Sequence, residues 1–227
     1  SMEYARDLVE AIDPLRREMR LRIRTTLLDR DWPLDWNLFN CVPRDEMLSI
    51  IGFKTFVDGT LGSRTARMLQ PFADAPNDCG LFMELAERGV LAEWLREGLR
   101  RDFSMSLHAI GDAALRAVLD AADASELRGV PAREALRIEH AQTVHPNDLP
   151  RMKGRWASMQ PLHKFHDAPG AERALGAERM DRFFPFRALQ EAGAMLAFGS
   201  DWPIVPPDVI AGMRAAITGL VLLVDEA

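Results

Sequence analysis

The sequence predicts an α/β fold in which parallel strands are connected by crossover helices. Segments with the three- to four-residue periodicity of amphipathic helices alternate repeatedly with short strand-like runs along the chain. This alternation is typical of βαβ units, whose parallel strands are joined through helices. With 48% hydrophobic and 27% charged residues, the chain can bury a core as one domain or most of one. About six strands are expected, two fewer than a closed eight-stranded barrel contains.

The expected strands are short apolar runs bounded by polar or turn-forming residues. They cover residues 21–27, 52–57, 104–108, 136–140, 156–159 and 195–198. Residues 60–80 show no strong period and are expected to form a long loop.

Helices are expected where apolar residues recur on one face at helical spacing. Pro14 is expected to kink or split the first of them, because proline cannot donate a backbone hydrogen bond. Asp112 is expected to cap the third helix, and the fifth is expected to end at Gly193. The expected helices are 3–19, 83–101, 112–124, a short helix starting at 146, 182–192 and 208–218.

The chain is acidic, with 28 Lys and Arg against 34 Asp and Glu, and its net charge is -6. Binding to nucleic acid or anionic lipid would therefore require a local basic patch. The candidate is residues 16–24, but its charges alternate with Met19, Leu21 and Ile23, which favours a helix end entering a strand. We therefore expect no nucleic-acid partner.

The cysteine content and the lack of long apolar runs predict a cytoplasmic protein without membrane association. Cys41 and Cys79 show no short metal-type spacing and are too few for a disulfide framework. No apolar run approaches the roughly 20 residues that a membrane helix needs. Residues 1–6 also lack the charged-then-apolar order of a signal peptide.

Four polar residues lie at or just past the carboxyl ends of the expected strands: Lys54, His108, His140 and Asp201. In parallel α/β barrels the active site is built at that end of the strands. Two imidazoles and a carboxylate from three strands can converge on one zinc-like ion, which prefers nitrogen and oxygen ligands of this kind. The pattern therefore predicts a metal site.

Each of these residues also has a structural interpretation. A single histidine that closes a strand is more often a hydrogen-bonded core residue than a ligand, but three such strand ends together favour a site. Lys54 lies between Phe53 and Phe56 in an apolar strand, where a lysine needs a partner or a shifted pKa. A salt bridge from Lys54 to Asp58 or Glu139 is the alternative to a functional role.

Several motifs in order along residues 21–203 resemble the amidohydrolase superfamily, and within it the YtcJ-like branch, amidohydrolase family 3. The motifs that carry the resemblance are FKTFVDGTLGSRTA at 53–66, HAIGD at 108–112, IEHAQ at 138–142, ASMQP at 157–161 and FGSDWP at 198–203. The resemblance implies a (β/α)8 TIM-barrel-type metal-dependent hydrolase, of which about strands 3 to 8 are present.

The resemblance also implies roles for the residues at the strand ends. His108 and His140 would bind a divalent metal, while Asp201 would bind metal and act as the catalytic proton carrier. Lys54 matches a lysine that is carboxylated in many superfamily members, and its carbamate would bridge two metals. The implied cofactor is zinc, one or two ions. The implied reaction is hydrolysis of amide or other non-peptide C–N bonds in a small-molecule amide-type substrate.

Arg64, Gln160, His163 and Trp202 lie just beyond expected strand ends and are candidate substrate-binding residues. The planar guanidinium of Arg64 suits a substrate carboxylate or carbonyl. For each of the four, a structural role in its loop is the alternative. His145 at a helix start and His166 in an expected polar loop are left out of the site.

The chain departs from the superfamily pattern in lacking a His-x-His pair. The nearest candidates, His163 and His166, are separated by two residues. We therefore expect residues 1–227 to form a single partial barrel without the family's β-sandwich, as a truncated form with weak or no activity. The alternative is a non-catalytic regulatory or scaffold homologue. No Gly-x-Gly-x-x-Gly or phosphate-loop pattern supports a nucleotide-binding protein.

An incomplete barrel leaves strand edges exposed, and such edges pair with other chains unless they are covered. We therefore expect the protein to self-associate through these edges.

Overall fold

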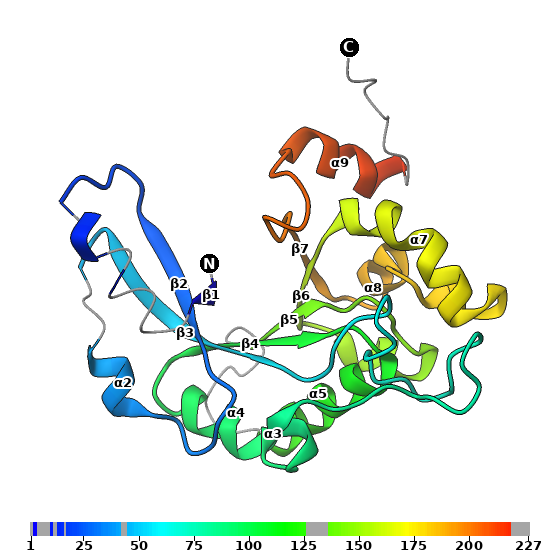
Figure 1. Ribbon diagram of the computed structural model, residues 1–227, viewed down its shortest axis with the longest axis horizontal. Coiled ribbons are helices and arrows are strands. Elements are labelled where there is room, and N and C mark those ends of the chain that lie inside the picture. Colours follow the sequence, from blue (N-terminus) through cyan, green and yellow to red (C-terminus); the bar gives the residue numbers. More distant parts are fainter. Residues whose placement is uncertain are drawn as a thin grey trace.

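A computed structural model of the chain describes residues 2–3, 10, 13–15, 17–41, 45–125 and 136–218. Its strands form one parallel sheet whose spatial order is the sequence order (Figure 1). The strands are β1 Met2–Glu3, β2 Ile23–Leu28, β3 Leu48–Phe56, β4 Ser104–Ala109, β5 Leu136–His140, β6 Trp156–Met159 and β7 Met195–Phe198.

This sheet confirms the predicted fold class, an incomplete (β/α) barrel. Every pair of neighbouring strands is parallel, which is the arrangement of a barrel sheet. Within the described residues β1 pairs only with β2 and β7 only with β6, so the sheet has two edges. All six expected strands are present, and β3 starts at Leu48 instead of residue 52.

The first predicted helix is not continuous where the structure describes it. Glu3 belongs to β1, which pairs with Thr26 and Leu27 of β2 and was not expected. Around Pro14 the chain forms a short 3-10 helix, η2 Asp13–Leu15, because proline suits a first turn but not a helix interior. The remainder of that prediction, at 4–9, 11–12 and 16, lies outside the described residues.

The other expected helices are present, with unchanged bounds at 112–124 and changed bounds elsewhere. The predicted helix 83–101 is split at Gly89, whose φ of 69° is a left-handed conformation that ends a helix. Asp112 begins its helix but does not cap it, because its carboxylate accepts a hydrogen bond from the Leu69 amide at 2.8 Å. The helices are α2 Trp36–Cys41, α3 Glu84–Glu87, α4 Leu91–Leu99, α5 Asp112–Ala124, η3 Pro146–Met152, α7 Pro161–Leu175, η4 Ala177–Arg182, α8 Phe186–Glu191 and α9 Val209–Thr218.

Helix α7 differs from the prediction, because the sequence around His166 predicts a polar loop. Its sequence carries Pro169 in its interior and no continuous apolar stripe, so periodicity gives little signal there. The helix starts at Pro161, where proline is favoured in the first turn. It buries Leu162 and His163 at its start and Leu175 at its end. Tertiary packing therefore stabilises a helix that local preference does not predict.

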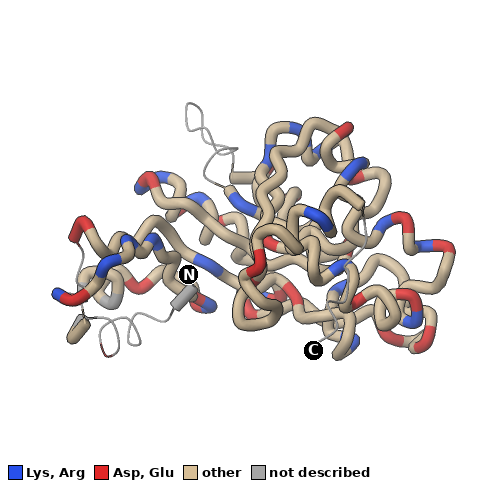
Figure 2. Tube along the Cα trace, turned by 90° about the horizontal axis from the view of Figure 1, so that it is seen from above, with Lys and Arg blue, Asp and Glu red and all other residues tan. Residues whose placement is uncertain are grey.

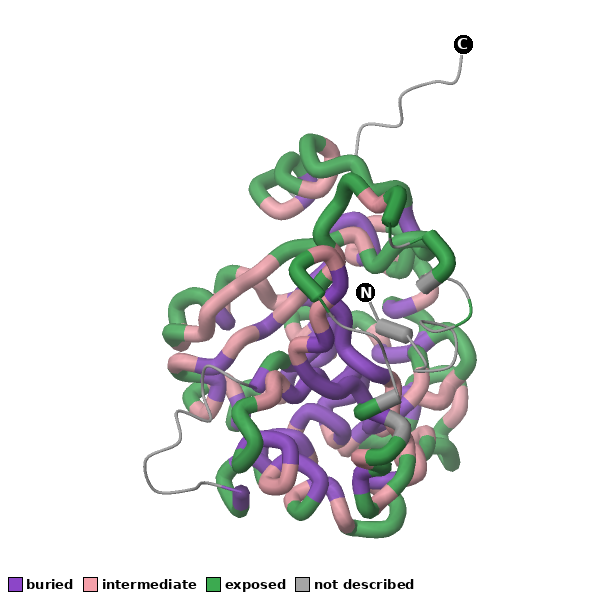
Figure 3. The backbone as a smooth tube through the Cα atoms, turned by 90° about the vertical axis from the view of Figure 1, so that its left-hand side faces the viewer, coloured by how far each residue is buried: buried purple, intermediate pink, exposed green. Residues whose placement is uncertain are grey.

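The main core lies between the sheet and the helices α4 and α5, which pack against β4 (Figure 1). Leu95 and Leu115 from these helices are fully buried, as are Met105 and Leu107 of β4. Figure 3 shows the buried residues concentrated in the central strands, whereas α9 is mostly exposed. Successive strand residues alternate between the two faces of a sheet. The opposite face of β3 to β5 is therefore free to carry polar residues.

Basic and acidic residues are interspersed along the described chain (Figure 2). In the described part of the chain, no helix is both long enough and apolar enough to cross a membrane.

Candidate metal centre

A cavity of about 1130 Å³ lies on the polar face of the sheet, at the carboxyl ends of its strands. Strand alternation explains the lining from β5: Ile138 is buried in the core, while its neighbours Arg137 and Glu139 face the cavity. Six of the eight residues predicted for the site line this cavity: Lys54, His108, His140, His163, Asp201 and Trp202.

His140 reaches the cavity through an irregular strand end. Alternation alone would place it with Ile138 on the core side of β5. However, His140 and Ala141 have φ values of 72° and 42°, which end the regular strand conformation, and His140 lines the cavity. Asp201, in the loop after β7, also has a left-handed φ, 55°. Non-glycine residues rarely adopt this conformation, and such residues cluster at functional sites.

The His140 ring is held in one orientation by Gln160. Its Nδ1 donates a hydrogen bond to the Gln160 Oε1 at 2.8 Å, and the Gln160 Nε2 donates to the Ser158 carbonyl at 3.3 Å. Because an amide oxygen only accepts, Nδ1 carries the proton and Nε2 keeps its lone pair. Burial lowers the pKa of His140 to about 4. The ring is therefore neutral at physiological pH, the form in which histidine binds metals.

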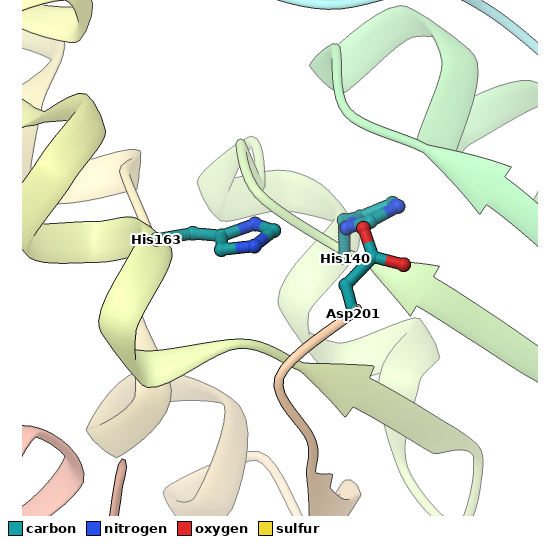
Figure 4. A group of neighbouring side chains, drawn as sticks. All are labelled: His140, His163 and Asp201. Atoms are coloured by element: carbon teal, nitrogen blue, oxygen red, sulfur yellow. The ribbon is translucent and has the colours of Figure 1, made fainter. Parts of the chain in front are cut away.

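His163 and Asp201 bring further donor atoms close to His140. One ligand atom from each of the three residues lies within 4.8 Å of the other two (Figure 4). In Figure 4, His163 extends from the start of α7 toward the His140 ring and the Asp201 carboxylate. His163 Nε2 is buried and has no hydrogen-bond partner. Two imidazoles and a carboxylate match the ligand preference of zinc and similar ions, so these residues fit a divalent metal.

His108 lies beside His140, with 4.6 Å between the ring centroids, but its Nε2 is turned elsewhere. It donates a hydrogen bond to the Gly59 carbonyl at 2.9 Å and lies 3.7 Å from Asp58 Oδ1. Burial and, to a smaller extent, the neighbouring His140 hold the pKa of His108 well below its usual value. The structure thus groups His163, instead of His108, with His140 and Asp201.

Asp58 fastens the strand end next to His108. Its carboxylate accepts hydrogen bonds from the backbone amides of Arg67, Ile110 and Gly111 at 2.7 to 3.0 Å. The side chain is fully buried, and this burial raises its pKa to about 7. Asp58 is therefore committed to the backbone and does not pair with Lys54.

Lys54 is buried on the cavity wall, with 7% of its surface exposed. Burial lowers its pKa to about 8, against the opposite effects of the Glu139 and Asp201 carboxylates. Glu139 itself accepts a hydrogen bond from Arg137 Nε at 2.5 Å. The lysine thus has carboxylates nearby, and part of its population is an uncharged amine near neutral pH.

Comparison with known proteins identifies the family of the chain. The sequence profile described as the amidohydrolase family matches residues 5–222. The chain belongs to the amidohydrolase family. It is 33% identical over 175 residues to "Protein LONG AFTER FAR-RED 3" of Arabidopsis thaliana, which covers 76% of this chain and 30% of that protein. It is 31% identical over 169 residues to "Putative amidohydrolase YtcJ" of Bacillus subtilis (strain 168), covering 72% of this chain and 30% of the relative.

One solved structure is similar to the chain in both fold and sequence. The chain superposes on an uncharacterized metal-dependent hydrolase from Pyrococcus furiosus with a TM-score of 0.78 and 28% identity, over 96% of this chain and 45% of that one. The predicted resemblance to YtcJ-like amidohydrolases is confirmed. This amidohydrolase-family chain spans less than half the length of the relatives it matches.

Two predicted substrate-binding residues do not line the cavity of this family member. The Arg64 Nε donates to Asp74 Oδ1 at 2.8 Å, and its two terminal nitrogens bond Asp74 and the Leu61 carbonyl. Arg64 therefore stabilises the loop after β3. This is the structural role given above as the alternative to substrate binding. Gln160 orients His140 from behind. Trp202 lines the cavity and is 70% exposed.

His163 lies in the predicted cavity but in a different structural setting from the one expected. It was expected to contact substrate from a loop, whereas it lies in the first turn of α7 beside His140 and Asp201. A signal was present, because Pro161 directly after the strand 156–159 is favoured in a first helical turn. A histidine two residues later would then lie over the strand end.

Proposed function

We propose that this chain carries the site of a metal-dependent hydrolase that cleaves amide or other non-peptide C–N bonds in small molecules. The observation that carries the proposal is the convergence of neutral imidazoles and the Asp201 carboxylate in one cavity at the strand ends. Support also comes from family membership and from the Pyrococcus furiosus hydrolase, which is described as metal-dependent.

His140 and Asp201 would hold the ion, with His108 and Lys54 on the adjoining wall. A divalent metal, which we propose to be zinc, supplies a Lewis acid that polarises a carbonyl and lowers the pKa of water. Gln160 keeps His140 in the tautomer that presents Nε2 to the cavity. The uncharged Lys54 amine can add to carbon dioxide and release a proton, and the resulting carbamate would supply oxygen ligands in place of a cation.

Asp201 is the proposed proton carrier. Its carboxylate accepts a proton from the attacking water as the new C–O bond forms, and returns it to the nitrogen as the C–N bond breaks. The exposed loop position of Asp201 gives the carboxylate the freedom to reach both atoms. Trp202 offers an apolar surface at the same end of the cavity for the substrate.

Hydrolysis of N-formyl and N-acyl amines by the purified, zinc-loaded chain tests this proposal. We expect slow turnover that falls by about 100-fold or more in Asp201→Asn, the usual scale of losing a general base. The control is Glu93→Gln, which removes an exposed carboxylate on α4. We also expect stoichiometric zinc binding that His140→Ala abolishes.

The activity is proposed to be weak because the five histidines of the chain form no His-x-His pair. The same observation favours the second candidate, a regulatory or scaffold protein that keeps the barrel shell. Stoichiometric zinc binding with no turnover of any amide would support that candidate. Absence of zinc binding would contradict the hydrolase proposal.

A further inference from the structure

We propose that His163 is a protein ligand of the metal, so that one divalent ion is held by His140, His163 and Asp201. This inference rests on the proposed function and deepens it, because it names a coordinating set that differs from the predicted one.

The first observation is an unpartnered buried atom. His163 is 7% exposed, and its Nε2 has no hydrogen-bond partner. A buried polar group without a partner costs about 1–3 kcal/mol. A cation shared with His140 and Asp201 would satisfy this atom.

The second observation is the orientation of the His140 ring. His140 uses Nδ1 for the hydrogen bond to Gln160, which leaves the lone pair of Nε2 available. His163 has its Nε2 buried and unpartnered. Each histidine therefore keeps an Nε2 that no protein group occupies, and the His140 ring is fixed through its other nitrogen, the usual arrangement of a metal-binding histidine.

The third observation is the spacing. Ligand atoms about 2.0–2.2 Å from one tetrahedral zinc ion lie about 3.3–3.6 Å apart. The three residues offer atoms within 4.8 Å of one another, so an inward movement of at most about 1.5 Å suffices. Asp201 can supply it, because it lies on an exposed loop, while His140 and His163 are buried.

The predicted alternative to His163 is His108. Its Nε2 is already occupied by the Gly59 carbonyl at 2.9 Å. While this bond is kept, His108 could bind an ion only through Nδ1, and His108 does not belong to the close group of ligand atoms formed by His140, His163 and Asp201. The three-residue set can therefore form without rearranging β4 or the loop after β3.

Cobalt(II) titration of the full chain tests the inference, because cobalt has a visible spectrum that reports its ligands, whereas zinc has none. Calorimetry gives affinity and stoichiometry alongside. The variants are His163→Ala, His163→Gln, which keeps most of the side-chain volume, and His108→Ala. His166→Ala is the matched control, since His166 is an exposed histidine on the same helix.

We expect one cobalt per chain, a loss of affinity of about 100-fold or more in both His163 variants, and a changed spectrum of any residual complex. His166→Ala should bind as the wild type does. Unchanged affinity and spectrum in the His163 variants, with loss of both in His108→Ala, would overturn the inference and leave the proposed function standing. Cobalt binding that needs His163, without amide hydrolysis, would support the inference and contradict the hydrolase. No cobalt binding by the wild type would overturn both.

Discussion

The orientation of a side chain in the cavity depends on neighbours that do not line the cavity themselves. Gln160 is the clearest case, because its oxygen accepts from His140 Nδ1 and its amide nitrogen is itself held by the Ser158 carbonyl. Such a pair fixes both the tautomer and the direction of a metal-binding ring.

Gln160→Leu should therefore weaken zinc binding by about 10- to 100-fold, the usual effect of removing a partner behind a metal ligand. Gln160→Glu should retain most of the affinity, because a carboxylate still accepts from Nδ1. Isothermal titration calorimetry measures both, with Gln190→Leu as a control at an exposed position on α8. Equal zinc affinity in Gln160→Leu and the wild type would show that the ring needs no support.

Lys54 should reduce the stability of the metal-free protein. Its pKa is about 8 in the fold, against the ordinary lysine value of about 10.4 in an unfolded chain. The unfolded state therefore binds more protons between about pH 8 and 10, so the free energy of unfolding rises with pH across that range. Below about pH 8 the full penalty applies, at most about 3 kcal/mol.

Lys54→Met should raise the free energy of unfolding by about 1–3 kcal/mol near pH 7 and remove the rise above about pH 8. Urea unfolding of the chelated, carbon dioxide-depleted protein at several pH values tests this. A less stable variant, or one that keeps the rise, would show that the buried amine is not the cause.

At the scale of secondary structure elements, close packing between β3 and β4 requires a glycine. A Cβ placed on Gly52 would lie 1.7 Å from the Ser104 carbonyl oxygen of β4. Because that oxygen belongs to the backbone, a side-chain movement cannot remove the clash. The strands would have to separate at the point where Lys54 and His108 are brought into the same cavity.

Gly52→Ala should therefore lower the free energy of unfolding by about 3 kcal/mol or more, as overpacking does when the neighbour cannot move. The matched control is Gly212→Ala on α9, where no atom lies within 4 Å of the added Cβ. That substitution should stabilise the helix by about 0.5–1 kcal/mol. Chemical unfolding of both variants distinguishes the two effects, and similar values for both would contradict the packing argument.

For the whole molecule, the exposed apolar residues gather at one end of the sheet. In the described residues β7 pairs on one side only, with β6. Helix α9 follows β7 along the chain and packs against α7, where it buries Ala215 but exposes Val209, Ile210, Met213 and Ile217. Exposed apolar side chains gathered on one helix are typical of an interaction surface, and an open strand edge pairs readily. We therefore propose that the chain self-associates through this end.

Light scattering after size exclusion should give a mass above 25.5 kDa that increases with concentration. Ile210→Lys should shift the protein toward the monomer. Leu81→Lys, an exposed apolar residue outside α9, should leave the mass unchanged. A monomeric wild type at every concentration would contradict the proposal.

The sequence by itself determined the parallel α/β class, the strands that carry Lys54 and His108, and the strand that precedes Asp201, because periodicity and strand-end position are local properties. It also carried the motifs that place the chain in the amidohydrolase family. Only the tertiary structure decided that His163 joins His140 and Asp201, that His140 turns into the cavity and that Arg64 binds Asp74. The positions of His163 and His140 depend on a helix stabilised by packing and on a left-handed backbone conformation at a strand end. Neighbouring residues in the sequence do not specify either feature.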